Sequence, residues 1–103
     1  MGASAVSNED LLARVRAIAA KVLHGHGARV YLFGSHATGR THRLSDVDIA
    51  VEATRPLPAG LLARLREAFE ESDLPMRVDV VDINETDESL RSRIRAEAIE
   101  WSV

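Results

Sequence analysis

The sequence contains no cysteine, and this absence excludes two common ways of stabilising a small domain. Disulfide frameworks and thiolate zinc sites both require cysteine sulfur. The histidines do not replace it, because none stands four residues from another, as a helical metal site requires. They are His24, His26, His36 and His42.

Long apolar runs and a strong net charge are also absent. No run approaches the roughly 20 residues needed to span a bilayer, and residues 1–7 lack the basic and apolar segments of a signal peptide. With 13 basic and 16 acidic residues the net charge is −3, too mild for a membrane patch or for general attraction to nucleic acid. We therefore expect a cytoplasmic protein with no membrane contact and no strong nucleic-acid binding.

The length of 103 residues predicts one domain, residues 1–103, in which we expect residues 1–6 to be disordered. A chain of this length can bury one hydrophobic core but has no room for an added substrate-binding domain. Any large acceptor must therefore be presented by another molecule.

Hydrophobic spacing predicts three helices and three strands in the order α-β-loop-β-α-β-α. The expected strands are residues 30–33, 45–52 and 77–83. The first helix follows a cap at Ser7, the second opens at Pro56 and Pro58, and the last is capped by Asn84 or Thr86. We expect that last helix to turn these residues inward: Leu90, Ile94, Ala98 and Trp101. This order favours an α/β (α+β) fold, a small sheet with helices packed on it.

Asp46 and Asp48 interrupt the second strand without breaking its core face. Side chains alternate between the faces of a strand, so Val47, Ile49 and Val51 share one face. The two aspartates share the other face, which we expect to lie open to water or to a ligand.

The third strand carries another acid of the same kind. Val78 and Val80 form its core pair, so Asp79 lies on the opposite face. If the two strands are neighbours, Asp79 joins Asp46 and Asp48 on one patch. Asp82 lies on the same face as the core residues Val78 and Val80, so it is a poorer candidate for this acidic patch.

Three carboxylates on one patch suggest bound cations. Asp46 and Asp48 stand roughly 6–7 Å apart along the strand, and their charges repel. Mg²⁺ relieves such repulsion, since it prefers carboxylate and phosphate oxygens. Two metal ions between such acids are the arrangement used in nucleotidyl transfer.

The loop after the first strand has the residues needed to hold polyphosphate. Gly34 allows the backbone to approach a phosphate closely, and Ser35 adds a hydroxyl donor. Arg40 and Arg43 can neutralise phosphate charge. Taken singly, each feature has a plainer explanation: a solvated D-x-D strand, a solvated basic loop, or a surface histidine at His36. Their occurrence together favours a site that binds metal and phosphate.

Gly34-Ser35, ten residues and then Asp46-Val47-Asp48 resembles the G-S-x10-D-x-D signature of the DNA polymerase β-like nucleotidyltransferases. The surrounding "YLFGSHATG", "SDVDIAVE" and "RVDVVDI" are similar to the minimal nucleotidyltransferase (MNT) branch, over roughly residues 10–83. The family position after the serine is often Arg or Phe, and here it is His36.

The resemblance implies a polymerase β-like palm fold, with a small mixed β-sheet and helices packed on one face. Asp46 and Asp48 match the metal-ligating aspartates, and Asp79 matches the third carboxylate, which ligates metal and acts as general base. Gly34 and Ser35 match the phosphate-binding pair. Two Mg²⁺ ions would be held once ATP is bound.

Family members of this size are typically encoded beside a higher-eukaryote-and-prokaryote nucleotide-binding (HEPN) protein, which resembles a ribonuclease toxin. The resemblance thus implies an antitoxin that transfers AMP from ATP to a hydroxyl of a HEPN partner. The alternative is a binding module that neutralises its partner by complex formation through an exposed apolar surface. A calcium-stabilised acidic strand is a third interpretation, but it leaves the Gly-Ser spacing unexplained.

Overall fold

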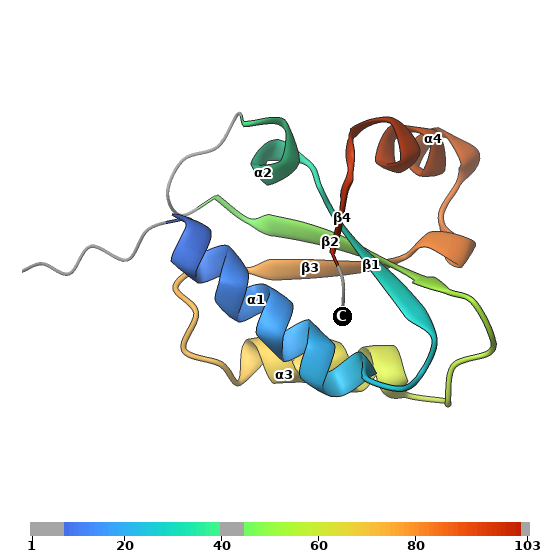
Figure 1. The fold of residues 1–103 in the computed structure, drawn as a ribbon, viewed down its shortest axis with the longest axis horizontal. Coiled ribbons are helices and arrows are strands. Elements are labelled where there is room, and N and C mark those ends of the chain that lie inside the picture. Colours follow the sequence, from blue (N-terminus) through green and yellow to red (C-terminus); the bar gives the residue numbers. More distant parts are fainter. Residues whose placement is uncertain (1–7, 40–44, 102–103) are drawn as a thin grey trace, which may run out of the picture.

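The computed structural model describes residues 8–39 and 45–101, and it forms one sheet with helices on both faces (Figure 1). The expectations for residues 1–6 and for a cap at Ser7 concern residues outside the described part. The same is true of Arg40 and Arg43.

Four strands make the sheet, in the order β3-β2-β1-β4. Their bounds are β1 Ala28–Phe33, β2 Val47–Ala53, β3 Val78–Asp82 and β4 Ile99–Trp101. Strand β1 is antiparallel to β2 and β4, whereas β2 and β3 are parallel. The mixed sheet confirms the expected fold class. The parallel pair requires a crossover connection, which contains α3 (Leu61–Glu70).

Helices α1 (Asn8–Leu23) and α3 lie together over one face of the sheet (Figure 1). Their apolar positions recur every three or four residues, so each helix presents one apolar stripe. The main core lies between them and the sheet and includes Val15, Leu23, Val30, Ile49, Leu65, Phe69, Val80 and Trp101. Two helices thus cover one face as expected, and a further helix packs on the opposite face, where none was expected.

Helix α4 (Glu88–Glu97) packs on the opposite face and forms a second, smaller core. Ile94 is 1% exposed and clusters with Phe33, Ala50 and Ile83. Leu90 and Ala98 pack against the same cluster. Only part of this face is covered, so the remainder is available to polar side chains.

The expectation that the last helix carries Trp101 inward is wrong. Helix α4 ends at Glu97, because Ala98 adopts an extended conformation (φ −75°, ψ 152°). The chain then forms β4, where Trp101 stands opposite Val30 and enters the main core from a strand. Leu90, Ile94 and Ala98 face the second core as expected.

The predicted caps of α4 are also wrong. The cap is Asp87, whose Oδ1 accepts a hydrogen bond of 2.8 Å from the Leu90 amide. A short 3-10 helix, Ile83–Glu85, contains Asn84 and delays the start of α4. Thr86 donates its hydroxyl to the Ile83 carbonyl instead.

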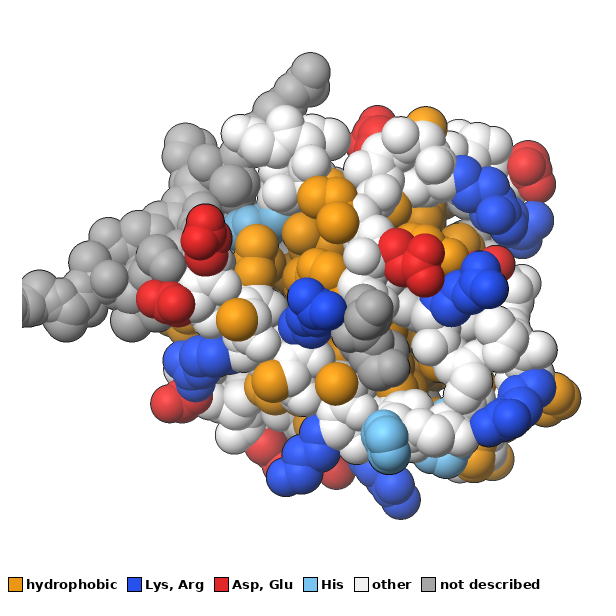
Figure 2. All heavy atoms as spheres, viewed as in Figure 1, with side chains coloured by type: hydrophobic (Ala, Val, Ile, Leu, Met, Phe, Trp, Pro, Cys, Tyr) orange, Lys and Arg blue, Asp and Glu red, His pale blue; other side chains and the backbone are white. Residues whose placement is uncertain are grey.

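Some element ends differ from prediction. Strand β2 begins at Val47, so Asp46 precedes it, and α3 begins at Leu61 after Gly60 rather than at the prolines. Acidic and basic side chains are interspersed over the face drawn in Figure 2, in keeping with the net charge of −3. None of the helices in the described part is long and apolar enough to cross a membrane.

Replacing Ile94 by alanine tests whether the second core holds α4. Truncating a buried isoleucine costs about 2–5 kcal/mol, so Ile94→Ala should lower the free energy of unfolding by that amount in urea denaturation. Ile99→Ala is the matched control, because Ile99 is 48% exposed and should lose less than about 1 kcal/mol. Equal losses in the two variants would contradict a second core.

Candidate active site

Strand β2 fixes Asp48 through the residues on either side of it. Val47 and Ile49 are fully buried in the main core, which forces the intervening side chain onto the opposite face. There Asp48 is half-buried, and the next residue on that face, Ala50, is covered in the second core. The predicted alternation of β2 is confirmed.

The pairing of β2 with β3 brings the predicted third acid to Asp48. In the parallel register Asp48 stands opposite Asp79, and partners across a pair point to the same face. Val78 and Val80 contact the main core, as expected. Asp46 lies just before β2 and is exposed.

Asp82 stays outside this group. It pairs with Val51, and its Oδ1 accepts a 2.9 Å hydrogen bond from the Asn84 amide at the start of the 3-10 helix. Its role is a cap, which agrees with its poorer rank in the sequence.

The surroundings of Asp48 disfavour its charge. Burial, followed by the charges of Asp79 and Asp46, raises the pKa of the Asp48 carboxyl above its ordinary value. Electrostatic interactions with Arg93 and with the His36 ring act in the opposite direction without cancelling the effect. Carboxyls with raised pKa values at converging acids are typical of functional sites.

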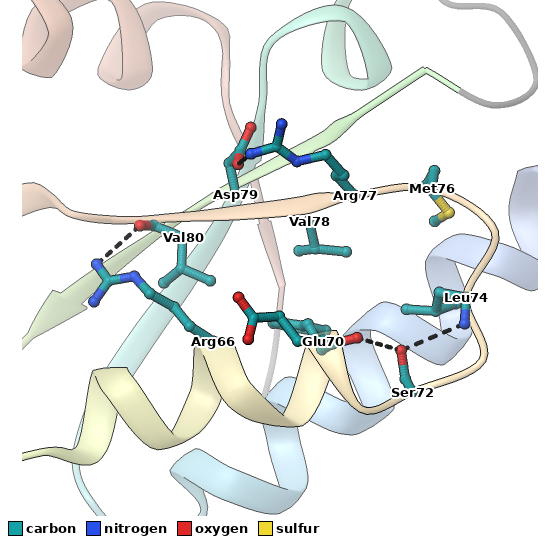
Figure 3. A pocket seen from close by; sticks show the side chains of 10 residues that line it. Arg66, Glu70, Ser72, Leu74, Met76, Arg77, Val78, Asp79 and Val80 are labelled. Atoms are coloured by element: carbon teal, nitrogen blue, oxygen red, sulfur yellow. Dashed lines mark hydrogen bonds and ion pairs between the residues drawn. The ribbon is translucent and has the colours of Figure 1, made fainter.

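Asp79 forms an ion pair with Arg77, which lies just before β3. Arg77 Nη2 lies 3.5 Å from Asp79 Oδ1, and the Asp79 side chain is 44% exposed. Figure 3 shows this pair on one side of β3, while Val78 and Val80 point to the other side, toward α3. A hollow of about 430 Å³ follows this edge of the sheet, between α3 and β3.

The acids do not form a preformed metal cage. Within residues 8–39 and 45–101, no three His, Cys, Asp or Glu side chains are arranged as a metal site. The donors are nevertheless the oxygen ligands that Mg²⁺ prefers, and Mg²⁺ commonly completes its shell with substrate phosphates.

Gly34 is required by the approach of Asp48. Its φ of 78° lies in the left-handed region, and a Cβ there would stand 2.5 Å from Asp48 Oδ2. Any side chain would therefore displace the carboxylate. Helix α2 (Ser35–Thr38) begins directly after Gly34, so its first amides lie at the site.

His36 links α2 to the segment that leads into β2. Its Nε2 lies 3.0 Å from the Ser45 carbonyl oxygen, so the ring donates from this nitrogen. His36 belongs to α2 and is partly buried, so it is not simply a surface histidine.

One residue of the site was missed in the sequence. Arg93 of α4 lines a hollow of about 330 Å³ together with Gly34, Ser35, Thr38 and Glu97. Its neighbours Arg91 and Arg95 give the same local pattern, so only the packing of α4 distinguishes it.

The comparisons with known proteins agree with this geometry. A family profile described as "Polymerase beta, Nucleotidyltransferase" matches residues 14–100. A protein of Haemophilus influenzae named "Probable protein adenylyltransferase MntA" is 46% identical over 66 residues, 64% of this chain. The chain spans 58% of the length of that relative.

Solved structures agree as well. One described as a candidate minimal nucleotidyltransferase has a TM-score of 0.71 and 35% identity, with 94% of this chain and 98% of that chain covered. A toxin-antitoxin structure with AMP-PNP has a TM-score of 0.65 and 29% identity, with 85% and 73% covered. The chain therefore belongs to the polymerase β nucleotidyltransferase family.

Proposed function

We propose that the protein is a Mg²⁺-dependent nucleotidyltransferase that transfers AMP from ATP to a hydroxyl of a partner protein. The observation that carries this proposal is the register that sets Asp48 beside Asp79, next to Gly34. A fold gains nothing from neighbouring acids of one sign on a half-covered face. A reaction that collects cations and phosphates gives them a use.

The residues divide the reaction between them. Gly34 and Ser35 hold the β- and γ-phosphates through backbone amides and the serine hydroxyl, and Arg40 and Arg43 add positive charge. Asp46, Asp48 and Asp79 supply the oxygens that would hold Mg²⁺, which when bound neutralises charge developing on the phosphates.

Asp79 acts on the acceptor. It accepts the proton of the acceptor hydroxyl as that oxygen bonds to the α-phosphorus, and the bond to the β-phosphate breaks to release pyrophosphate. This role requires Asp79 to exchange its contact with Arg77 for the acceptor. The 79% exposure of the Arg77 side chain makes the exchange inexpensive.

The acceptor that fits best is a HEPN-type toxin, which makes the protein an antitoxin. Support comes from the name of the H. influenzae relative, a protein adenylyltransferase, and from the similar toxin-antitoxin structure with AMP-PNP. Neutralisation by binding alone is the second candidate. That candidate expects an exposed apolar surface around Trp101 or on the open side of the first helix. Among the described residues Trp101 is buried, and Ile99 is the one large hydrophobic side chain that is exposed.

Transfer of label from α-labelled ATP tests the proposed reaction. With Mg²⁺ and a HEPN-type partner protein, the wild type should label the partner. Asp79→Asn should lose about 10²–10⁴-fold in rate, because it cannot accept the proton. Asp48→Asn should lose at least as much.

Asp82→Asn is the matched control, since Asp82 lies on the same strand but acts only as a cap. It should retain wild-type transfer. If the wild type and Asp48→Asn silence the partner equally without any label, the binding module is correct and the enzyme is not.

Asp48→Asn should also stabilise the nucleotide-free protein at neutral pH. The folded-state pKa of Asp48 is raised, so the folded protein binds more protons and its stability falls as the pH rises through the interval above the ordinary value. Removing the charge should raise Tm by a few degrees at pH 7, with the difference shrinking toward pH 3. Thermal unfolding followed by circular dichroism measures this, and a lower Tm at pH 7 would contradict the described electrostatics.

A further inference from the structure

The hollow between α2 and α4 combines the predicted phosphate loop with a cation from a distant part of the chain. Gly34, Ser35 and Thr38 form one wall, and Arg93 and Glu97 form the other. Both helices lie on the same side of the sheet (Figure 1). Building on the proposed function, we propose that Arg93 binds the β- and γ-phosphates of the nucleotide.

The packing of α4 fixes the direction of Arg93. Ile94 is buried in the second core and anchors the helix, so its neighbours flank that contact on opposite sides. Arg93 and Glu97, one turn apart, both face α2.

The other arginines of α4 are engaged elsewhere. Arg91 donates to the carbonyls of Ile83 and Thr86 and pairs with Glu88. Arg95 Nη2 lies 3.8 Å from Glu52 Oε2. Of the three arginines of the helix, Arg93 is the one that lines the hollow with Gly34 and Ser35.

The charge of Arg93 reaches the acid site. Its field opposes the rise in the pKa of Asp48, as expected for a guanidinium near that carboxylate. A nucleotide whose α-phosphate lies at Asp48 would extend its remaining phosphates along Gly34 and Ser35 into this hollow. A guanidinium binds phosphate oxygens in pairs, so Arg93 suits the end of the polyphosphate chain.

Glu97 limits the kind of ligand that fits. Its carboxylate lies on the same wall, one turn after Arg93, and would repel phosphate. The hollow is therefore not a general anion site, and the phosphates belong at its Gly34 and Arg93 end. This arrangement favours a ligand with a localised triphosphate over nucleic acid or a diffuse polyanion.

Nucleotide affinity distinguishes Arg93 from a matched arginine. Arg93→Gln and Arg95→Gln each remove one positive charge from an exposed position of the same helix. With Mg²⁺ present, Arg93→Gln should weaken the binding of a non-hydrolysable ATP analogue by about tenfold or more, because a charged hydrogen bond to phosphate is lost. Arg95→Gln should remain within about twofold of the wild type.

AMP and a second variant locate the contact. AMP lacks the β- and γ-phosphates, so its affinity should change by less than about twofold in Arg93→Gln. Arg93→Lys should recover part of the ATP affinity because it keeps the charge but not the paired donors. Circular dichroism melts of all three variants report whether the fold is retained.

Three results would overturn the inference: equal loss in Arg93→Gln and Arg95→Gln, equal loss for AMP and the ATP analogue, or no recovery in a folded Arg93→Lys. If the wild type labels its partner while Arg93→Gln binds the ATP analogue normally, the inference fails and the proposed function stands. If the wild type neither binds ATP nor transfers label, both fail.

Discussion

The site depends on one choice of register, the parallel pairing that sets Asp79 opposite Asp48. A slip of one residue would turn Asp79 toward the core and a valine toward the site, because side chains alternate along a strand. The two acids cannot hold this register themselves, since their charges repel. The apolar residues on the other face do so: Val47, Ile49 and Val80 are buried in one core, and Val78 packs against it. The apolar half of each strand thus determines where the acids meet.

The second core completes the arrangement by partly covering the acidic face. Ile94 brings α4 against Ala50, one strand period from Asp48. Burial raises the pKa of Asp48, and the position of α4 brings Arg93 beside Gly34. Gly34 in turn leaves the Asp48 carboxylate the space that a Cβ would occupy. The proposed metal and phosphate sites therefore depend on the same packed elements, so a substitution such as Ile94→Ala is expected to disturb both.

The sequence predicted the features that follow from local periodicity, but it missed features that depend on contacts between segments far apart in the sequence. Alternation in β2 and β3 gave the common face of Asp48 and Asp79, and the Gly34-to-Asp46 spacing gave the family. Strand β4 was missed because residues 99–101 are too short to show a pattern, and their strand form depends on pairing with β1. Arg93 was missed because three arginines alternate along α4, and only burial of Ile94 shows which of them faces α2. The metal and the roles of Arg40 and Arg43 remain predictions.

We propose that Asp46, Asp48 and Asp79 hold Mg²⁺ only together with the phosphates of a nucleotide. The most direct measurement is the affinity for a non-hydrolysable ATP analogue, determined by calorimetry with and without Mg²⁺, for the wild type and for Asp48→Asn. Mg²⁺ should tighten binding at least about tenfold in the wild type, a coupling of about 1.4 kcal/mol, and should have little effect in Asp48→Asn. Equal affinity with and without Mg²⁺ in the wild type, or an undiminished Mg²⁺ effect in Asp48→Asn, would contradict this proposal.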